Sequence, residues 1–185
     1  MLEHSKIETM NQMTSQSQIP ATITKRLLAV IYDSFLLIAV LFLAMAVLLL
    51  VSGGYPFQAG NPFMTIYLLI VSFAFFGWFW THGGQTLGMR AWKLRIQQQT
   101  GEAITWRQAA VRFVTAVPAW VVLFIGMALV ADIPLHAHPW LDQLSRLPAW
   151  LILIVGIGWL VVDQWPDGWR DKVSGTRVIK LEKNY

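Results

Sequence analysis

The stretch LLAVIYDSFLLIAVLFLAMAVLLLV, residues 27–51, indicates what kind of protein this chain forms. Only two polar side chains, Asp33 and Ser34, interrupt its 25 residues. A helix of about 20 apolar residues crosses a hydrocarbon core about 30 Å thick. We therefore predict a membrane-spanning helix over residues 27–51.

Three more apolar segments follow this one along the chain. Residues 63–80 and 113–131 contain no charged side chain, and both are long enough, or nearly so, to cross a bilayer. The segment 147–163 has 16 apolar residues before Asp163, so it can span only if the helix continues into the interface. Helices buried in a soluble protein need amphipathic partners, and this chain has almost none. We predict an all-α membrane protein with four transmembrane helices.

The composition excludes several classes of protein. Hydrophobic residues make up 56% of the 185 residues and charged residues 13%, whereas soluble domains carry about 25% charged residues. The chain has no cysteine, which excludes disulfides and thiolate metal sites. It also lacks a nucleophile and a base at a catalytic spacing, a phosphate-binding loop and a metalloprotease motif. We expect neither enzymatic activity nor a cofactor.

The basic residues predict the orientation in the membrane. With four spanning helices, 13 of the 14 Lys and Arg residues fall in the two termini and in the loop between the second and third helices. Positive charge marks the cytoplasmic side, so both termini are expected there. These residues flank helices instead of forming a stacking face, so we expect no nucleic-acid partner. Residues 1–22 are polar and predict a disordered tail without a cleavable signal, followed by a transmembrane domain over 23–183.

A glycine-rich segment follows the second helix. Gly83, Gly84 and Gly88 can adopt backbone conformations or close approaches that other residues cannot. We interpret them as a tight turn at the cytoplasmic surface. The alternative is that the Gly84 and Gly88 spacing forms a notch for helix packing.

Alternating segments predict a small cytoplasmic β-sheet. Residues 92–105 are typical of a hairpin, with a turn at 99–102. Residues 175–181 alternate in the same way, and two strands need a third for stability. We therefore expect the tail strand to join the hairpin. Thr105 and Gln108 fit a capping box that begins the next helix at Trp106.

Asp33 is the charged residue that most requires a partner, because a carboxylate inside a membrane helix costs on the order of 2.5 to 3.5 kcal/mol at mid-depth. Arg26 lies on nearly the same helix face but about 10 Å away along the axis, so a direct bond is not expected. Three interpretations are open for these charges: a structural ion-pair network, a proton- or cation-coupled site, and a contact with headgroups or a partner. The expected partners of Asp33 are Arg90, Arg95, Arg112 or Arg177, and those of Arg26 are Asp163 or Asp171.

A second cluster falls in the predicted outer loop and comprises Asp132, His136, His138 and Asp142. Histidine and carboxylate side chains can ligate a transition metal. Pro134 and Pro139 within the cluster favour an ordinary loop instead, and we assign no metal site.

Three motifs in order resemble the RDD family of prokaryotic membrane proteins, named for one arginine and two aspartates. They are Arg26-Leu-Leu-Ala-Val-Ile-Tyr-Asp33, the stretch from Gly84 to Ile96, and Asp171-Lys-Val-Ser-Gly-Thr-Arg-Val178. The resemblance covers residues 24–180 and implies functional roles for Arg26, Asp33 and Asp171. Two positions depart from the pattern: Met89 replaces a frequent lysine, and Arg170 replaces the usual histidine. The second change argues against a proton relay through that histidine and favours a structural salt bridge.

The resemblance implies transport of small ions or solutes across a bacterial cytoplasmic membrane. We expect a small transporter, of the cation/proton exchange type, that uses Asp33 with Arg26 and Asp171. Four helices make a small transporter, so a homo-oligomer would then be expected. The alternative is a non-transporting accessory subunit with another membrane protein as partner.

Overall fold

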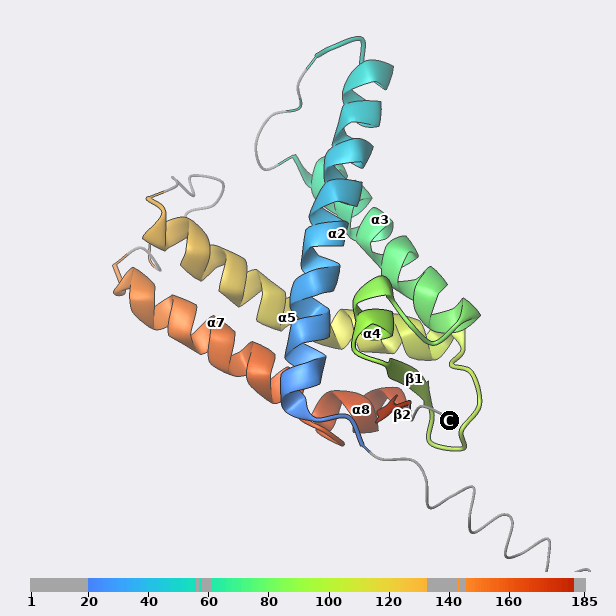
Figure 1. Cartoon of the computed structure of the whole chain (residues 1–185). Helices are drawn as coiled ribbons and strands as arrows, with labels where there is room; N and C mark the ends of the chain where they lie inside the picture. The colour runs from blue at the N-terminus through green and yellow to red at the C-terminus, as the bar shows by residue number, and fades with distance from the viewer. Residues whose placement is uncertain (1–19, 56, 58–60, 133–142, 144–145, 182–185) are drawn as a thin grey trace, which may run out of the picture.

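The computed structural model describes residues 20–55, 57, 61–132, 143 and 146–181, and it is mostly helical (Figure 1). The elements, in chain order, are α2 (Ile23–Val51), α3 (Pro62–His82), α4 (Leu87–Ala91), β1 (Leu94–Gln98), α5 (Trp106–Val130), α7 (Ala149–Asp163), α8 (Trp169–Ser174) and β2 (Thr176–Lys180). The short elements α4, β1, α8 and β2 gather at one end of the long helices, which we call the sheet end (Figure 1).

Helices α2, α3 and α5 are long and apolar enough to cross a membrane. They contain the predicted segments 27–51, 63–80 and most of 113–131. Helix α7 has only 15 residues, which at 1.5 Å each gives about 22 Å, less than the thickness of a hydrocarbon core. It ends at Asp163 and does not continue into Trp165 as a fourth span would require. Three of the four predicted spans are therefore supported by length and composition.

Helix α2 is longer than its membrane-spanning part. Its 29 residues correspond to about 43 Å, and a bilayer core takes up about 30 Å of that length. The buried residues of α2 are Arg26, Ala29 and Asp33, all in its first 11 residues. The first three turns of α2 therefore pack against the elements of the sheet end, and the rest presents apolar side chains outward.

Helix α5 begins at the predicted capping box and packs along α7. The Thr105 hydroxyl accepts from the backbone N–H of Gln108, and the Gln108 side chain accepts from the N–H of Thr105. Along the pair, Gly126 of α5 faces the backbone of Leu153, and Gly156 of α7 faces the backbone of Leu123. A Cβ atom at either glycine would lie within 2.7 Å of that backbone. These two glycines therefore set the close separation of α5 and α7.

The sheet has two antiparallel strands, with Leu94 opposite Lys180 and Gln98 opposite Thr176. The prediction of a strand pair between the 92–98 and 175–181 regions is confirmed, but the predicted hairpin is wrong because residues 103–105 form no strand. The physical reason is that the other edge of β1 is already used. Its Ile96 N–H donates to the Gly84 carbonyl at 2.7 Å, and its Leu94 carbonyl accepts from the Gln85 side chain.

The chain before α2 also contacts the sheet. Pro20 forms an isolated bridge with Ile179, and the Ala21 N–H donates to the Val178 carbonyl at 3.2 Å. Ala21 is fully buried. The last residues of the predicted tail 1–22 are therefore packed on β2, while residues 1–19 lie outside the described residues.

Candidate functional site

Asp171 lies between two arginines at the sheet end. Arg26 Nη1 donates to Asp171 Oδ2 at 2.7 Å, and Arg112 Nη1 donates to Asp171 Oδ1 at 2.6 Å. All three side chains are at least 96% buried. Because the residues belong to α2, α5 and α8, the cluster ties three helices together. Of the two partners predicted for Arg26, Asp171 is confirmed and Asp163 is wrong.

The same arginines also bind β2. Arg26 Nη2 donates to the Val178 carbonyl at 3.2 Å, and Arg112 Nη1 donates to the Thr176 hydroxyl at 2.8 Å. Buried charges are tolerated when they are both paired and hydrogen-bonded. Strand β2 therefore helps to hold the two buried arginines in place.

Asp163 pairs with Arg170. Arg170 Nη1 donates to Asp163 Oδ2 at 2.6 Å, and the Arg170 Nε–H donates to the Arg112 carbonyl at 3.2 Å. The guanidinium also lies 6.0 Å from the ring centre of Trp80, which is buried although many tryptophans at segment ends are exposed. Arg170, the residue that departs from the family pattern, thus forms a buried salt bridge, in line with the structural role expected for it.

The electrostatics of α8 follow from burial and from these pairs. Burial alone would raise the pKa of Asp171, but Arg112 and Arg26 outweigh it and hold that pKa below its usual value. Burial, together with the neighbouring charge of Arg112, lowers the pKa of Arg170 to about 10. Both groups are therefore charged at neutral pH.

Asp33 is held in a different way. Its Oδ2 accepts from the Thr86 hydroxyl, and its Oδ1 accepts from the Gly88 N–H at 2.8 Å. Neither donor carries a charge, so the four arginines predicted as partners of Asp33 are wrong. Arg112, one of the four, binds Asp171 instead.

Thr86 and Gly88 place α4 against α2. The Thr86 hydroxyl also caps α4 by accepting from the Met89 N–H at 3.2 Å. A Cβ atom on Gly88 would lie 2.4 Å from the Ala29 carbonyl oxygen and 2.9 Å from the Asp33 carboxyl. Gly88 therefore lies in a helix contact, as in the packing alternative, and not in the predicted turn.

The other two glycines lie where α3 ends. Gly83 is the C-cap of α3, and Gly84 has a φ of +67°. A Cβ atom on Gly84 would lie 2.5 Å from the Ile96 carbonyl oxygen. Gly84 thus makes the turn and the close contact with β1 that set the edge of the sheet.

A cavity of about 510 Å³ lies between the helices beside these charges. Arg26 and Asp33 line it from α2, Arg112 from α5 and Arg170 from α8, and Gln164 at the end of α7 also lines it. Most of its remaining wall is apolar, with contributions from α2, α3 and α5. The cavity therefore brings the sequence-predicted residues Arg26 and Asp33 to one surface, while Asp163 and Asp171 lie behind the arginines and are not among its lining residues.

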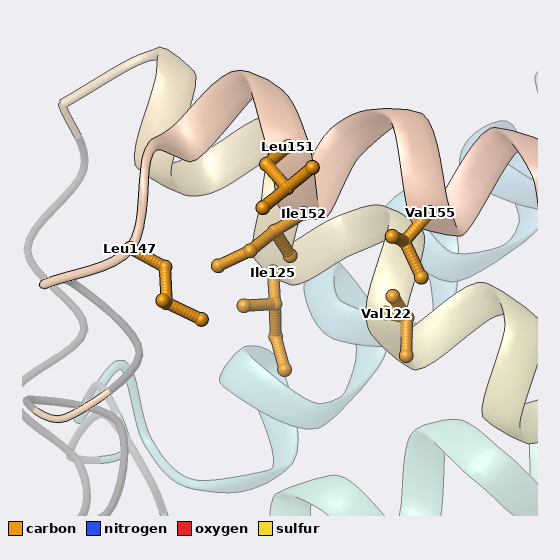
Figure 2. A pocket seen from close by; sticks show the side chains of 6 residues that line it. All are labelled: Val122, Ile125, Leu147, Leu151, Ile152 and Val155. Atoms are coloured by element: carbon orange, nitrogen blue, oxygen red, sulfur yellow. The ribbon is translucent and has the colours of Figure 1, made fainter.

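A second cavity, of about 250 Å³, lies between α5 and α7 (Figure 2). Its lining is entirely aliphatic: Val122, Ile125, Leu147, Leu151, Ile152 and Val155. Without a polar group it cannot bind an ion.

The predicted outer cluster falls mostly outside the described residues, since His136, His138 and Asp142 are not described. Within the part of the chain that the structure describes, no group of three or more His, Cys, Asp or Glu side chains could hold a metal ion.

Three contributors to the site were not expected from the sequence. Thr86 carries a signal of its own, because a threonine three residues before Met89 can cap a helix. The Gly88 N–H carries none, since every non-proline residue has a backbone donor. The pair of Arg170 with Asp163 joins the end of α7 to α8. The seven-residue spacing of the two side chains does not by itself predict that the chain turns between them.

The comparison with known proteins agrees with the motifs. The sequence model described as the RDD family matches residues 20–175. No curated protein and no solved structure matches the chain. Since the match includes Arg26, Asp33 and Asp171 and covers most of the 185 residues, the chain belongs to the RDD family.

Proposed function

We propose that this membrane protein is a small transporter that exchanges a cation for a proton, with Asp33 as the carboxylate that binds them alternately. The observation that carries the proposal is the environment of Asp33. It is 4% exposed, lines the cavity and is bonded only to the uncharged donors Thr86 and Gly88. Ionisable residues that line cavities between membrane helices are the usual carriers of protons and ions.

The ion pairs of Asp171 have a supporting role in this proposal. A carboxylate between two arginines is strongly biased toward its charged form, so it is poorly suited to exchange protons. Its bonds instead hold the first turn of α2 against α5 and α8. Arg26 and Asp171 therefore position the helix that carries Asp33.

The positive-inside distribution supports a location in the bacterial cytoplasmic membrane with the sheet end in the cytoplasm. We also propose that α7 crosses the membrane within an oligomer, because its length of about 22 Å is short for a helix facing lipid alone. In α2, no residue after Asp33 is buried. This leaves a long apolar face for a second copy of the chain.

Flux measurements on reconstituted protein test the proposal. Proteoliposomes with an imposed pH gradient and an internal pH dye should lose the gradient when Na⁺, K⁺ or Li⁺ is added outside. Asp33→Asn should abolish this response, since an amide cannot exchange a proton. The matched control is Asp167→Asn, which makes the same change at an exposed position and should respond like the wild type.

A second candidate function is that of a non-transporting accessory subunit. The observation in its favour is that Arg26, Arg112 and Arg170 are all engaged in buried ion pairs, an arrangement suited to a rigid scaffold. If wild-type protein moves none of the three cations while Asp33→Asn folds normally, transport is overturned and the accessory role takes its place.

A further inference from the structure

The 510 Å³ cavity is elongated along the helices. Along α2 its lining residues run from Arg26 to Leu41, and along α5 from Arg112 to Met127. Each range covers 15 residue steps, or about 22 Å of helix. The lining therefore extends along most of the thickness of a hydrocarbon core, which is about 30 Å.

One end of the cavity is basic, and most of the remaining lining is apolar. Arg26, Arg112 and Arg170 line the sheet end, where their acidic partners are Asp163 and Asp171. Three guanidinium groups and two carboxylates leave one positive charge in excess. Asp33 lies seven residues further along α2, about 10 Å away, and both its oxygens are bonded to α4.

The basic end also has hydrogen-bonding capacity that the protein does not use. Arg26 is 98% buried, and its Nε is one of two buried side-chain polar atoms, among the described residues, that have no hydrogen-bond partner. An unsatisfied buried donor costs about 1 to 3 kcal/mol. A ligand oxygen at the arginine end could satisfy it.

From these observations we propose that the cavity binds one anionic membrane phospholipid. Its phosphate lies at the end formed by Arg26, Arg112 and Arg170, and one acyl chain extends along the apolar wall between α2 and α5. The depth fits, because the three arginines lie near helix ends, and basic pockets between membrane helices at that level recognise lipid headgroups. The apolar wall matches an acyl chain.

Lipid retention tests the proposal. Full-length protein is purified in mild detergent from membranes, and its bound lipid is identified by native mass spectrometry. Delipidated protein is then reconstituted with phosphatidylglycerol or with phosphatidylcholine. We expect one retained lipid per chain and a preference of about fivefold for phosphatidylglycerol, as one excess arginine charge predicts.

A steric variant separates the cavity from the general lipid surface without touching the ion pairs. Val121→Trp places an indole in the cavity, and Val114→Trp makes the same change two turns earlier on the same helix, where Val114 is 65% exposed and does not line the cavity. Val121→Trp should lose the retained lipid, whereas Val114→Trp should keep it. Asp33→Asn is measured in parallel: it should lose the cation flux defined above and keep the retained lipid, so that failure of one proposal is distinguished from failure of the other.

Several results would overturn this inference. Equal retention of phosphatidylcholine would show that the arginines do not select an anionic headgroup. Retention of free palmitate in place of phospholipid would show that the ligand is not a phospholipid. Equal loss in both tryptophan variants would show that the lipid is bound elsewhere. If the wild type carries no lipid and Val121→Trp instead dissociates a dimer, the cavity belongs to a contact between copies.

Discussion

Asp171 and Asp33 are both buried carboxylates on one side of the same fold, yet they are stabilised in opposite ways. Asp171 accepts from two arginines, whereas Asp33 accepts from a hydroxyl and a backbone N–H. Charged partners bind the ionised carboxylate strongly and oppose protonation. Neutral donors also favour the ionised carboxylate, but less strongly than charged partners do. The difference assigns a holding role to Asp171 and leaves Asp33 able to change its charge.

Among the variants that test this comparison, Asp171→Asn should have the largest effect on stability. It removes the negative charge between Arg26 and Arg112 and leaves two buried guanidinium groups without a counter-charge. Loss of one partner of a buried pair costs about 3 to 5 kcal/mol, so thermal unfolding in detergent should occur at a much lower temperature. Asp167→Asn is the control, because Asp167 is exposed with a φ of +53° that asparagine accepts readily. Equal stability of the two variants would contradict the holding role.

Acid should reproduce part of that loss without mutation. The pKa of Asp171 is lowered in the folded protein, so its stabilisation is complete above the unfolded value of about 4. It is lost as the pH falls from there through the folded pKa. The unfolding temperature of the wild type should therefore fall toward that of Asp171→Asn between pH 5 and about pH 2. A constant difference between the two proteins over that range would show that the charge of Asp171 adds nothing.

Gly88→Ala disturbs the other carboxylate. The new Cβ atom would meet the Ala29 carbonyl oxygen and the Asp33 carboxyl, so α4 must move away from α2 and weaken the bond from the Gly88 N–H. Overpacking of this kind costs about 1 to 3 kcal/mol. Gly158→Ala is the control in a helix, since nothing lies within 4 Å of its Cβ position, and that change should be neutral or slightly stabilising. Chemical unfolding of both variants in detergent measures the difference, and a neutral Gly88→Ala would refute the contact.

The sequence predicts the parts of this molecule that depend on local pattern. Apolar length located α2, α3 and α5, and the Thr105 and Gln108 spacing located the start of α5. The pair of Arg26 with Asp171 was one of two candidates, because charge and burial restrict the choice of partner. These predictions hold because each rests on a property of the residues themselves.

The sequence does not predict contacts that depend on backbone groups. The sequence predicts an ion pair between Asp33 and an arginine, but Thr86 and the Gly88 N–H donate to both its oxygens instead. Likewise, the Gly84 carbonyl takes the edge of β1 that a hairpin strand would use. Both errors arise in the same segment, where glycine allows the backbone to approach closely enough to replace a side-chain partner.

The smallest effect on stability is expected for Asp33→Asn, and it makes the comparison sharpest. The amide oxygen can still accept from one donor, and the other donor loses its acceptor, a change of about 1 kcal/mol. Removal of a buried charge offsets part of that loss. The same chemical substitution should thus leave the unfolding temperature nearly unchanged at residue 33 and lower it strongly at residue 171. A large loss at Asp33 would mean that its negative charge is needed for folding, and it would then be a second holding residue instead of the exchanging one.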